Sequence, residues 1–155
     1  MIVMSLRDVA TAVAGEPSTD ADLSTVVSGR CEIDSRRVQP GDLFIAIKGD
    51  NHDGHDHVDA ALAAGAVAAV VTADGPGPRI LVPDTVAALA ALARAILEIR
   101  SDVTVIALTG SSGKTSTKDI IGQLLATSAP TVWPEGSFNN ELGLPLTVLR
   151  IDEET

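Results

Sequence analysis

A glycine-rich turn between an apolar run and a helical pattern constrains this chain more than any other stretch. The turn, TGSSGKTST, spans Thr109 to Thr117, the apolar run VTVIAL before it covers residues 103–108, and the helical pattern after it covers residues 118–126. A strand, a glycine-rich turn with Lys and Thr, and a helix together form the layout of a phosphate-binding loop. The order of these segments therefore predicts a phosphate site inside an α/β fold.

Each residue type in the turn has a physical reason to be there. Glycines let several backbone N–H groups point at one anion, and the first turn of a helix has N–H groups without partners inside the helix. Lys114 can reach terminal phosphates, and the Thr115 hydroxyl can bind the Mg²⁺ ion that a nucleotide carries. The longer pattern G-x-x-x-x-G-K-[ST] would require glycine where Leu108 stands, so the motif is the shorter T-G-x-x-G-K-T. The alternative is a Ser- and Gly-rich turn with an incidental lysine.

Composition restricts the class of protein and of partner. Hydrophobic residues make up 45% of the chain and aromatic residues only 2%. The core must therefore consist of Ala, Val, Leu and Ile, which suits helices packed closely on a sheet. The net charge of −10 argues against a sequence-independent nucleic-acid binder, which needs a basic face. An anionic ligand would have to be held by local amides and a few placed cations.

Cysteine content and hydropathy indicate the compartment. Cys31 is the single cysteine, so no disulfide can form within the chain, which fits a reducing cytoplasm. The N-terminus has no apolar run of signal length, and no stretch reaches the ~18 apolar residues of a membrane span. We expect a soluble cytoplasmic protein without a membrane span, and the sequence leaves its oligomeric state open.

The rest of the chain alternates strands and helices. We expect strands over residues 25–33 with a break at Gly29, 43–47, 66–72 and 79–82, and helices over residues 5–14, 56–65 and 83–100. Ser5 and Asp56 are suitable N-caps. This alternation predicts an α/β architecture with a largely parallel sheet. A charged junction near residues 100–102 predicts a boundary between a unit of residues 1–100 and a unit of residues 101–155.

The second unit is too short for a complete phosphate-loop domain. Such a domain needs several more strands to close its sheet. It also needs an acidic metal ligand on a later strand. We therefore expect the chain to be a piece of a longer protein.

Three ordered blocks resemble the Mur ligase family. TGSSGKTSTKD is similar to the family's ATP loop, and DSRRVQPGDLFIAIKG with DGHDHVDAALAAGAVAAVV is similar to its N-terminal uridine-diphosphate-binding domain. FNNELGLPLTVL, residues 138–149, resembles the branch that adds D-alanyl-D-alanine. The resemblance covers roughly residues 29–150. It implies a small N-terminal UDP-sugar-binding α/β domain, followed by the first strand–loop–helix unit of a mostly parallel-sheet ATP-binding central domain.

The resemblance implies an activity and its partners. Members form an amide at the cost of ATP: a substrate carboxylate is phosphorylated, and an incoming amine attacks the acyl phosphate. The branch resembled here joins D-alanyl-D-alanine to UDP-N-acetylmuramoyl-tripeptide during peptidoglycan synthesis. ATP and Mg²⁺ are therefore the expected cofactors. The later Mg²⁺ ligands and the C-terminal domain of the family have no counterpart, so this chain alone is expected to be inactive.

The resemblance also implies roles for individual residues. The triphosphate is expected to contact Gly110, Ser111, Ser112, Gly113, Lys114, Thr115 and Ser116. Within that set, Lys114 would stabilise the transferred phosphoryl group as the catalytic residue, and Thr115 would bind Mg²⁺. Ser35 and Arg36 would contact the uridine diphosphate with help from backbone near Lys48, and Asn139 and Asn140 would orient the muramoyl-peptide end.

Other interpretations stay open at this point. The whole protein could be the ligase that adds the third residue of the stem peptide, or a UDP-sugar- or nucleotide-binding module without catalysis. Asp34 to Arg36 could be only a solvated turn after a strand. His52, His55 and His57 could suggest a metal site, or they could belong to a structural loop in which Gly54 makes a tight turn. Asn139 and Asn140 could be only a cap for a helix that starts near Glu141.

Overall fold

The computed structural model describes residues 1–136 and 140–155, and its centre is a five-stranded sheet with the order β2-β7-β6-β5-β4. Strands β4 to β7 are parallel to their neighbours, and β2 is antiparallel to β7. A separate antiparallel ladder pairs β1 with β3. The strands are β1 Met4–Ser5, β2 Glu16–Pro17, β3 Val26–Val27, β4 Cys31–Glu32, β5 Leu43–Ile45, β6 Ala68–Val71 and β7 Arg79–Leu81. The structure confirms the predicted α/β class with a mostly parallel sheet.

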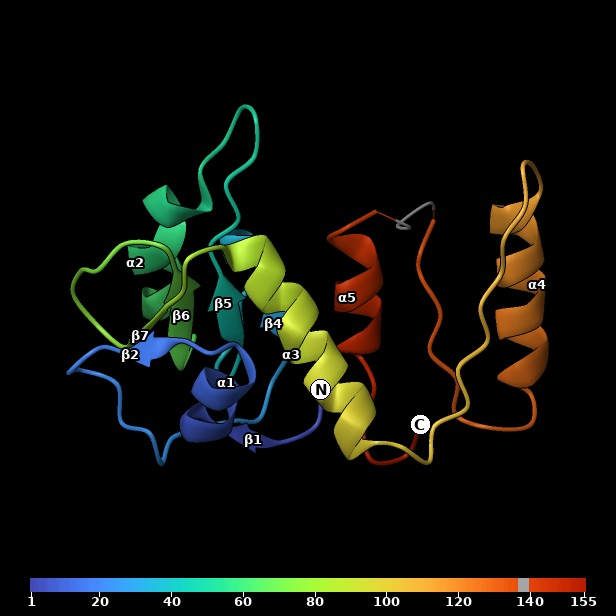
Figure 1. Cartoon of the computed structure of the whole chain (residues 1–155), viewed down its shortest axis with the longest axis horizontal. Coiled ribbons are helices and arrows are strands. Elements are labelled where there is room, and N and C mark those ends of the chain that lie inside the picture. Colours follow the sequence, from blue (N-terminus) through green and yellow to red (C-terminus); the bar gives the residue numbers. More distant parts are fainter. Residues whose placement is uncertain (137–139) are drawn as a thin grey trace.

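Helices cover both faces of this sheet (Figure 1). They are α1 Leu6–Ala12, α2 Val58–Ala63, α3 Thr85–Ile99, α4 Lys114–Leu125 and α5 Gly143–Val148, with the 3₁₀ turns η1 Ser35–Arg37 and η2 Gly54–His57. Helices α1 and α3 lie on one face and α2 on the other, while α5 packs against α3 and α4 stands apart from the sheet. Among the described residues, no helix is long and apolar enough to cross a membrane.

Alternating side chains of the central strands explain the two layers. Leu43 and Ile45 are buried together with residues of α1 and α3, whereas Phe44 and Ala46 are buried together with Val58 and other residues of α2. A strand that is buried on both faces reads as a continuous apolar run. The run from residue 43 to residue 47 was the signal for this strand, and the structure confirms it.

Side-chain caps fix where α1 and α3 begin. Ser5 and Asp8 form a reciprocal capping box at α1, as expected for Ser5. Asp84 caps α3 by accepting from two backbone N–H groups of its first turn. The predicted cap Asp56 is wrong, because η2 precedes α2. Asp53 caps η2 by accepting from the His55 N–H, and α2 begins at Val58 without a side-chain cap.

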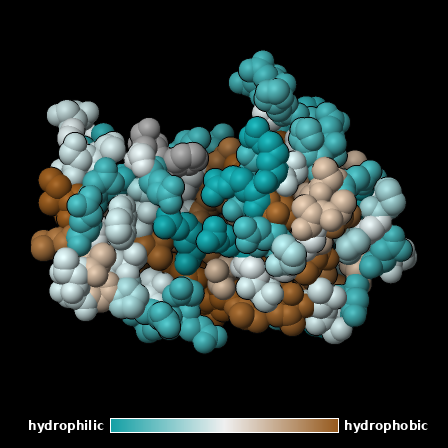
Figure 2. Space-filling view, turned by 180° about the vertical axis from the view of Figure 1, so that it is seen from behind, coloured by the Kyte–Doolittle hydropathy of each residue, from teal (hydrophilic) through white to brown (hydrophobic). Residues whose placement is uncertain are grey.

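The predicted strand over residues 103–108 is wrong. The segment is extended but joins no sheet in the described part of the chain. A strand is defined by pairing with neighbours, and no described strand lies beside this one. The exposed fractions of Val105 and Ile106 are 67% and 54%, and those of Ile120 and Leu124 on α4 are both 66%. Figure 2 shows hydrophobic surface at the left edge, on the side where α4 lies.

The end of α3 is joined to residues 152–155 by Arg100. Its Nε and Nη2 donate to the two carboxylate oxygens of Asp102 at 2.9 and 2.8 Å, and Nη2 also donates to the Thr155 carbonyl at 2.7 Å. Its Nη1 donates to the Asp152 carbonyl. Leu149 and Ile151 are buried with residues of the first unit. The proposed boundary between residues 1–100 and 101–155 stays a prediction.

Candidate functional site

The carboxyl ends of the parallel strands bring two of the predicted segments to one edge of the sheet. Strands β4 and β5 are paired and parallel, so the segments that follow them leave the sheet at the same edge. The first segment contains Ser35 and Arg36, and the second contains Lys48. Helix α2 also packs against η1. Ligands of open α/β sheets bind outside this edge.

Arg36 is held by Asp34 in a bidentate ion pair. Its Nε and Nη2 donate to Asp34 Oδ1 and Oδ2 at 2.8 and 2.7 Å, and its backbone N–H donates to Oδ1 at 3.1 Å. These hydrogen bonds from Arg36 lower the pKa of Asp34 to about 2. The Arg36 side chain is 87% exposed, so a diphosphate could approach the guanidinium from solvent. The turn predicted here is confirmed, and the ligand contacts of Ser35 and Arg36 stay a prediction.

Burial perturbs the acidic residue that ends β4. Glu32 is 8% exposed, and its carboxylate lies 3.8 Å from Nε of Arg37. Burial raises the pKa of Glu32, and the charge of Arg37 opposes part of that rise. The folded chain therefore binds this proton more tightly than the unfolded chain does.

We expect Glu32→Gln to be more stable than the wild type at neutral pH. A carboxyl whose pKa is raised by folding contributes to the free energy of unfolding. This contribution is complete below the ordinary pKa of 4.5 and is lost as pH rises through the pKa of the folded chain. The variant should gain in Tm between pH 5 and pH 8 and should match the wild type near pH 4. Thermal unfolding across this range measures the difference, with Glu16→Gln on the exposed β2 as the control. A lower Tm than the wild type at pH 7 would contradict the prediction.

The loop from Lys48 to His57 contains an isolated bridge and a tight turn. Lys48 pairs with Asp53 in an isolated bridge, and a Cβ on Gly54 would lie 2.7 Å from the backbone nitrogen of Ile47. Glycine is required at that position, which confirms the predicted tight turn. The described residues contain no group of three His, Cys, Asp or Glu side chains that could hold a metal ion. Nor does the sequence pattern indicate Thr72, which contacts the ring of His55 from the end of β6.

The glycine-rich turn leads into α4 as the motif predicts. Gly113 has φ = +76°, a left-handed conformation that favours glycine, and Lys114 is the first residue of the helix. No side chain caps α4, and its first internal bond runs from the Thr117 N–H to the Gly113 carbonyl at 2.9 Å. The amides of Lys114, Thr115 and Ser116 therefore lie at the helix start without an intrahelical partner.

These groups fit a triphosphate and its metal ion. Ser111, Ser112, Thr115 and Ser116 are exposed at the helix start. Lys114 Nζ donates to the Gly110 carbonyl within the turn, and among the described residues it makes no ion pair. An anion can thus meet an unneutralised ammonium and uncapped amides together. The Mg²⁺ contact of Thr115 stays a prediction.

The far side of α4 is braced by the segment at residues 131–134. A Cβ on Gly122 would lie 2.5 Å from the indole of Trp133, so the ring packs flush against the helix backbone. Lys118 Nζ donates to the Pro134 carbonyl at 2.6 Å. Trp133 therefore serves packing. The two lysines of α4 differ in their contacts, since Lys118 is bonded to this segment and Lys114 to the glycine-rich turn.

Asn140 acts as a cap. Its Oδ1 accepts from the Gly143 N–H at 2.8 Å, and its carbonyl accepts from the Leu144 N–H at 3.2 Å. The capping interpretation is confirmed for this residue, although α5 starts at Gly143 rather than near Glu141. Asn139 lies outside the described residues. The proposed substrate contacts of Asn139 and Asn140 stay predictions.

The two groups of site residues lie on the same side of the molecule but in separate parts of it. In Figure 1 the polar loop after β5, the starts of α3 and α5, and the glycine-rich turn all point to the top. Within residues 1–136 and 140–155, no hydrogen bond or ion pair joins the Ser35–Arg36 turn to residues 110–116. A substrate that reaches both groups would have to span the space between them.

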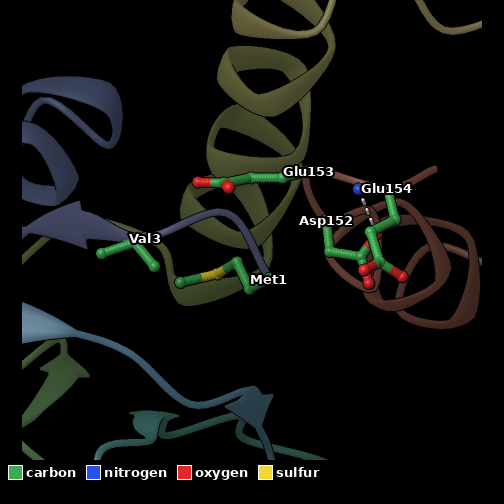
Figure 3. A pocket seen from close by; sticks show the side chains of 5 residues that line it. All are labelled: Met1, Val3, Asp152, Glu153 and Glu154. Atoms are coloured by element: carbon green, nitrogen blue, oxygen red, sulfur yellow. Dashed lines mark hydrogen bonds between the residues drawn. The ribbon is translucent and has the colours of Figure 1, made fainter.

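A shallow pocket at another place does not suit phosphates. Figure 3 shows Met1 and Val3 facing Asp152, Glu153 and Glu154. Three carboxylates beside two apolar side chains repel an anion. This pocket belongs to neither group of predicted residues.

Two family profiles match most of the chain. The Mur ligase family, catalytic domain, matches residues 30–96, and the Mur ligase middle domain matches residues 108–155. The chain belongs to the Mur ligase family. Both groups of predicted site residues that the structure describes lie within these Mur ligase matches.

Curated Mur ligases match the whole length of the chain. The UDP-N-acetylmuramoyl-tripeptide--D-alanyl-D-alanine ligase of Mycobacterium tuberculosis (strain H37Rv) is 39% identical in an alignment 184 positions long, which covers 100% of this chain and 36% of the relative. The ligase of that name from Bacillus subtilis is 39% identical in an alignment 160 positions long, which covers 100% of this chain and 35% of the relative. The chain thus spans about a third of the length of these Mur ligases.

Solved structures of Mur ligases have the same fold. MurF from Acinetobacter baumannii matches with a TM-score of 0.88 and 36% identity, over 98% of this chain and 34% of that one. MurF ligase from Thermotoga maritima in complex with ADP matches with a TM-score of 0.70 and 41% identity, over 79% of this chain and 29% of that one. The fold described above is therefore that of a Mur ligase segment.

Proposed function

We propose that this chain supplies the UDP-sugar-binding part and the ATP loop of a ligase that joins D-alanyl-D-alanine to UDP-N-acetylmuramoyl-tripeptide. The observation that carries the proposal is the turn at Gly113, which opens an uncapped helix with Lys114 at its start. It occurs in a chain whose whole length is similar to UDP-N-acetylmuramoyl-tripeptide--D-alanyl-D-alanine ligases. The buried free Cys31 also fits the reducing cytoplasm in which we place the reaction.

The residues would divide the work between two substrates, the UDP-linked tripeptide and ATP. Arg36 and Ser35, on the edge of the sheet, would hold the uridine diphosphate. Amides at the start of α4 and the ammonium of Lys114 would hold the triphosphate. Mg²⁺, bound in part by Thr115, would neutralise charge on the phosphates. In the proposed reaction, the tripeptide carboxylate takes the terminal phosphoryl group and ADP leaves, and the dipeptide amine then displaces phosphate to form the amide.

Calorimetric titration of the chain tests the first half of this proposal. We expect UDP-N-acetylmuramoyl-tripeptide to bind, because its diphosphate contacts lie on the folded sheet. Mg·ATP should bind weakly, because among the described residues no second segment encloses a nucleotide bound at the glycine-rich turn. Equal binding of UDP-N-acetylmuramoyl-tripeptide and unrelated UDP-sugars would point to a general nucleotide-binding module instead.

A chimera tests the second half. Residues 1–155 of this chain would replace the matching segment of the Bacillus subtilis relative. The chimera should release ADP only when both the UDP-linked tripeptide and D-alanyl-D-alanine are present. ATP hydrolysis without either substrate would contradict the ligase assignment and favour a general NTPase.

A further inference from the structure

His55 holds the loop that follows β5 against the end of β6. Its side chain is 19% exposed. Its Nδ1 lies 2.6 Å from Oδ1 of Asp53, and its Nε2 lies 3.0 Å from both the backbone nitrogen and Oγ1 of Thr72. Thr72 follows β6 directly and is 17 residues away in sequence. One ring therefore joins two segments at the same edge of the sheet.

The contacts determine which ring nitrogen carries the proton. A backbone N–H can only donate, so Nε2 must accept from Thr72, and the proton of the neutral ring is on Nδ1. That proton is donated to the Asp53 carboxylate, which also accepts from the backbone N–H of His55 at 3.0 Å. These hydrogen bonds from His55 hold the pKa of Asp53 below its usual range. Asp53 is therefore ionised throughout the range in which a histidine titrates.

The charges around the ring come from its own loop. Asp53 faces Nδ1, and Nζ of Lys48 lies 3.8 Å from Oδ2 of that carboxylate. From β6, only the uncharged Thr72 contacts the ring among the residues that the structure describes. Asp53 attracts a protonated ring, but the Thr72 N–H can bond only a neutral one.

The contact between His55 and Thr72, called the tether below, is connected to the residues assigned to the UDP-sugar. His55 lies in η2, which is followed directly by α2, and α2 packs against η1. Ser35 and Arg36 are in η1, and Lys48 is bridged to Asp53. Figure 2 shows the polar loop as the hydrophilic projection at the top of the molecule. Among the hydrogen bonds of the described residues, those between His55 and Thr72 are the ones that join this loop to the end of β6.

We propose that His55 is a positioning residue for the UDP-sugar site: its neutral ring fixes the loop of residues 48–57 to the end of β6, and protonation of the ring removes the bond from the Thr72 N–H, loosens the loop and weakens binding. This inference rests on the proposed function. A proton on Nε2 would set two N–H donors 3.0 Å apart, so the bond from the Thr72 N–H is lost and only Oγ1 of Thr72 could still accept from the ring.

Nuclear magnetic resonance tests the tether without any ligand. In the ¹⁵N-labelled chain at pH 7.5, His55 should be the Nδ1–H tautomer. The amide resonance of Thr72 should shift with pH in step with the His55 ring. The other tautomer, or a Thr72 amide that does not follow the ring, would overturn the tether.

Calorimetry at two pH values tests the effect on the site. The probe is UDP-N-acetylmuramoyl-tripeptide, whose pyrophosphate diester does not titrate in this range. Wild-type affinity should fall about tenfold from pH 7.5 to pH 5.5, the effect of one lost hydrogen bond of ordinary strength. In His55→Gln the amide oxygen can still accept from Thr72, so affinity should stay within about threefold of the wild-type value at pH 7.5 and should not change with pH.

Three controls separate the role of His55 from a general effect of pH or folding. His55→Leu has no acceptor and should bind about tenfold more weakly at both pH values, with circular dichroism confirming its fold. His52→Gln and His57→Gln should keep the wild-type pH dependence. A pH dependence that persists in His55→Gln, or a wild type without one, would overturn the positioning role.

Failure of the proposed function gives a different result. If the wild type does not bind the UDP-linked tripeptide at pH 7.5, the proposed function is wrong and the role of His55 in binding is overturned with it. The resonance experiment needs no ligand, so it would still show whether His55 tethers the loop.

Discussion

Lys114→Ala in the chimera with the Bacillus subtilis relative is expected to lower kcat about 10³-fold or more, while UDP-N-acetylmuramoyl-tripeptide binds within about twofold of its normal affinity. Lys114 begins α4 beside uncapped amides, where its ammonium would meet the transferred phosphoryl group. The Ser35–Arg36 turn lies in a separate part of the fold. Steady-state kinetics and calorimetry measure the two effects.

Two variants serve as controls for this result. Lys118→Ala removes a cation of the same helix that is bonded to the Pro134 carbonyl, so kcat should change little. Arg36→Ala should have the converse effect, with UDP-sugar affinity reduced about tenfold to a hundredfold and kcat at saturation largely kept. If Lys114→Ala reduced kcat and UDP-sugar affinity by the same factor, the proposed division between the two groups would be wrong.

Asp42→Ala is expected to destabilise the chain by about 3 kcal/mol. Asp42 is 3% exposed, and its carboxylate accepts from the backbone N–H groups of Arg30 at 2.6 Å and Gln39 at 2.8 Å. The variant leaves two amides without these partners at the turn that leads into β5, and unpaired buried donors are costly. Urea unfolding measures the change in the free energy of unfolding.

The matched control is Asp50→Ala, at an exposed position in the loop after β5. It should change the free energy of unfolding by less than about 0.5 kcal/mol. Asp42→Asn should retain part of the stability, because an amide oxygen can still accept one of the two bonds. A loss for Asp42→Ala no larger than for the control would show that the two backbone bonds do not stabilise the fold.

Patterns of neighbouring residues predicted the helices and strands that are stabilised mainly by their own residues. The apolar run at residues 43–47 and the capping residue Ser5 each identify an element from its own residues, and the structure confirms these elements. The strand expected over residues 103–108 failed for the opposite reason. Its pairing depends on strands elsewhere, and the described chain contains none beside it. The prediction of Asp56 as a helix cap was also wrong. Asp53 and Asp56 are both suitable caps by residue type, and only the geometry of η2 shows that Asp53 is the one used.

In the candidate site, too, the sequence predicted what neighbouring residues form and missed a contact between distant segments. The order of glycine, lysine and threonine predicts the turn and the helix start, because a short motif contains all the parts. The bond between His55 and Thr72 joins separate segments, so no local pattern could indicate it. The ligand contacts of Arg36, Lys114 and Asn139 depend on a substrate and stay predictions. Asn139 also lies outside the described residues.

The contacts of Arg100 have a consequence for motion between the two groups of site residues. Its bonds to Asp102, to Asp152 and to Thr155 bind the last turn of α3 to the chain after α5. The charged junction near residues 100–102 is thus held fixed by these bonds, and it is not the place where the two parts of the chain would bend. If the ATP loop swings toward the sheet edge to close on a substrate, the bending falls in the two extended connections that flank α4, residues 103–110 and 129–134.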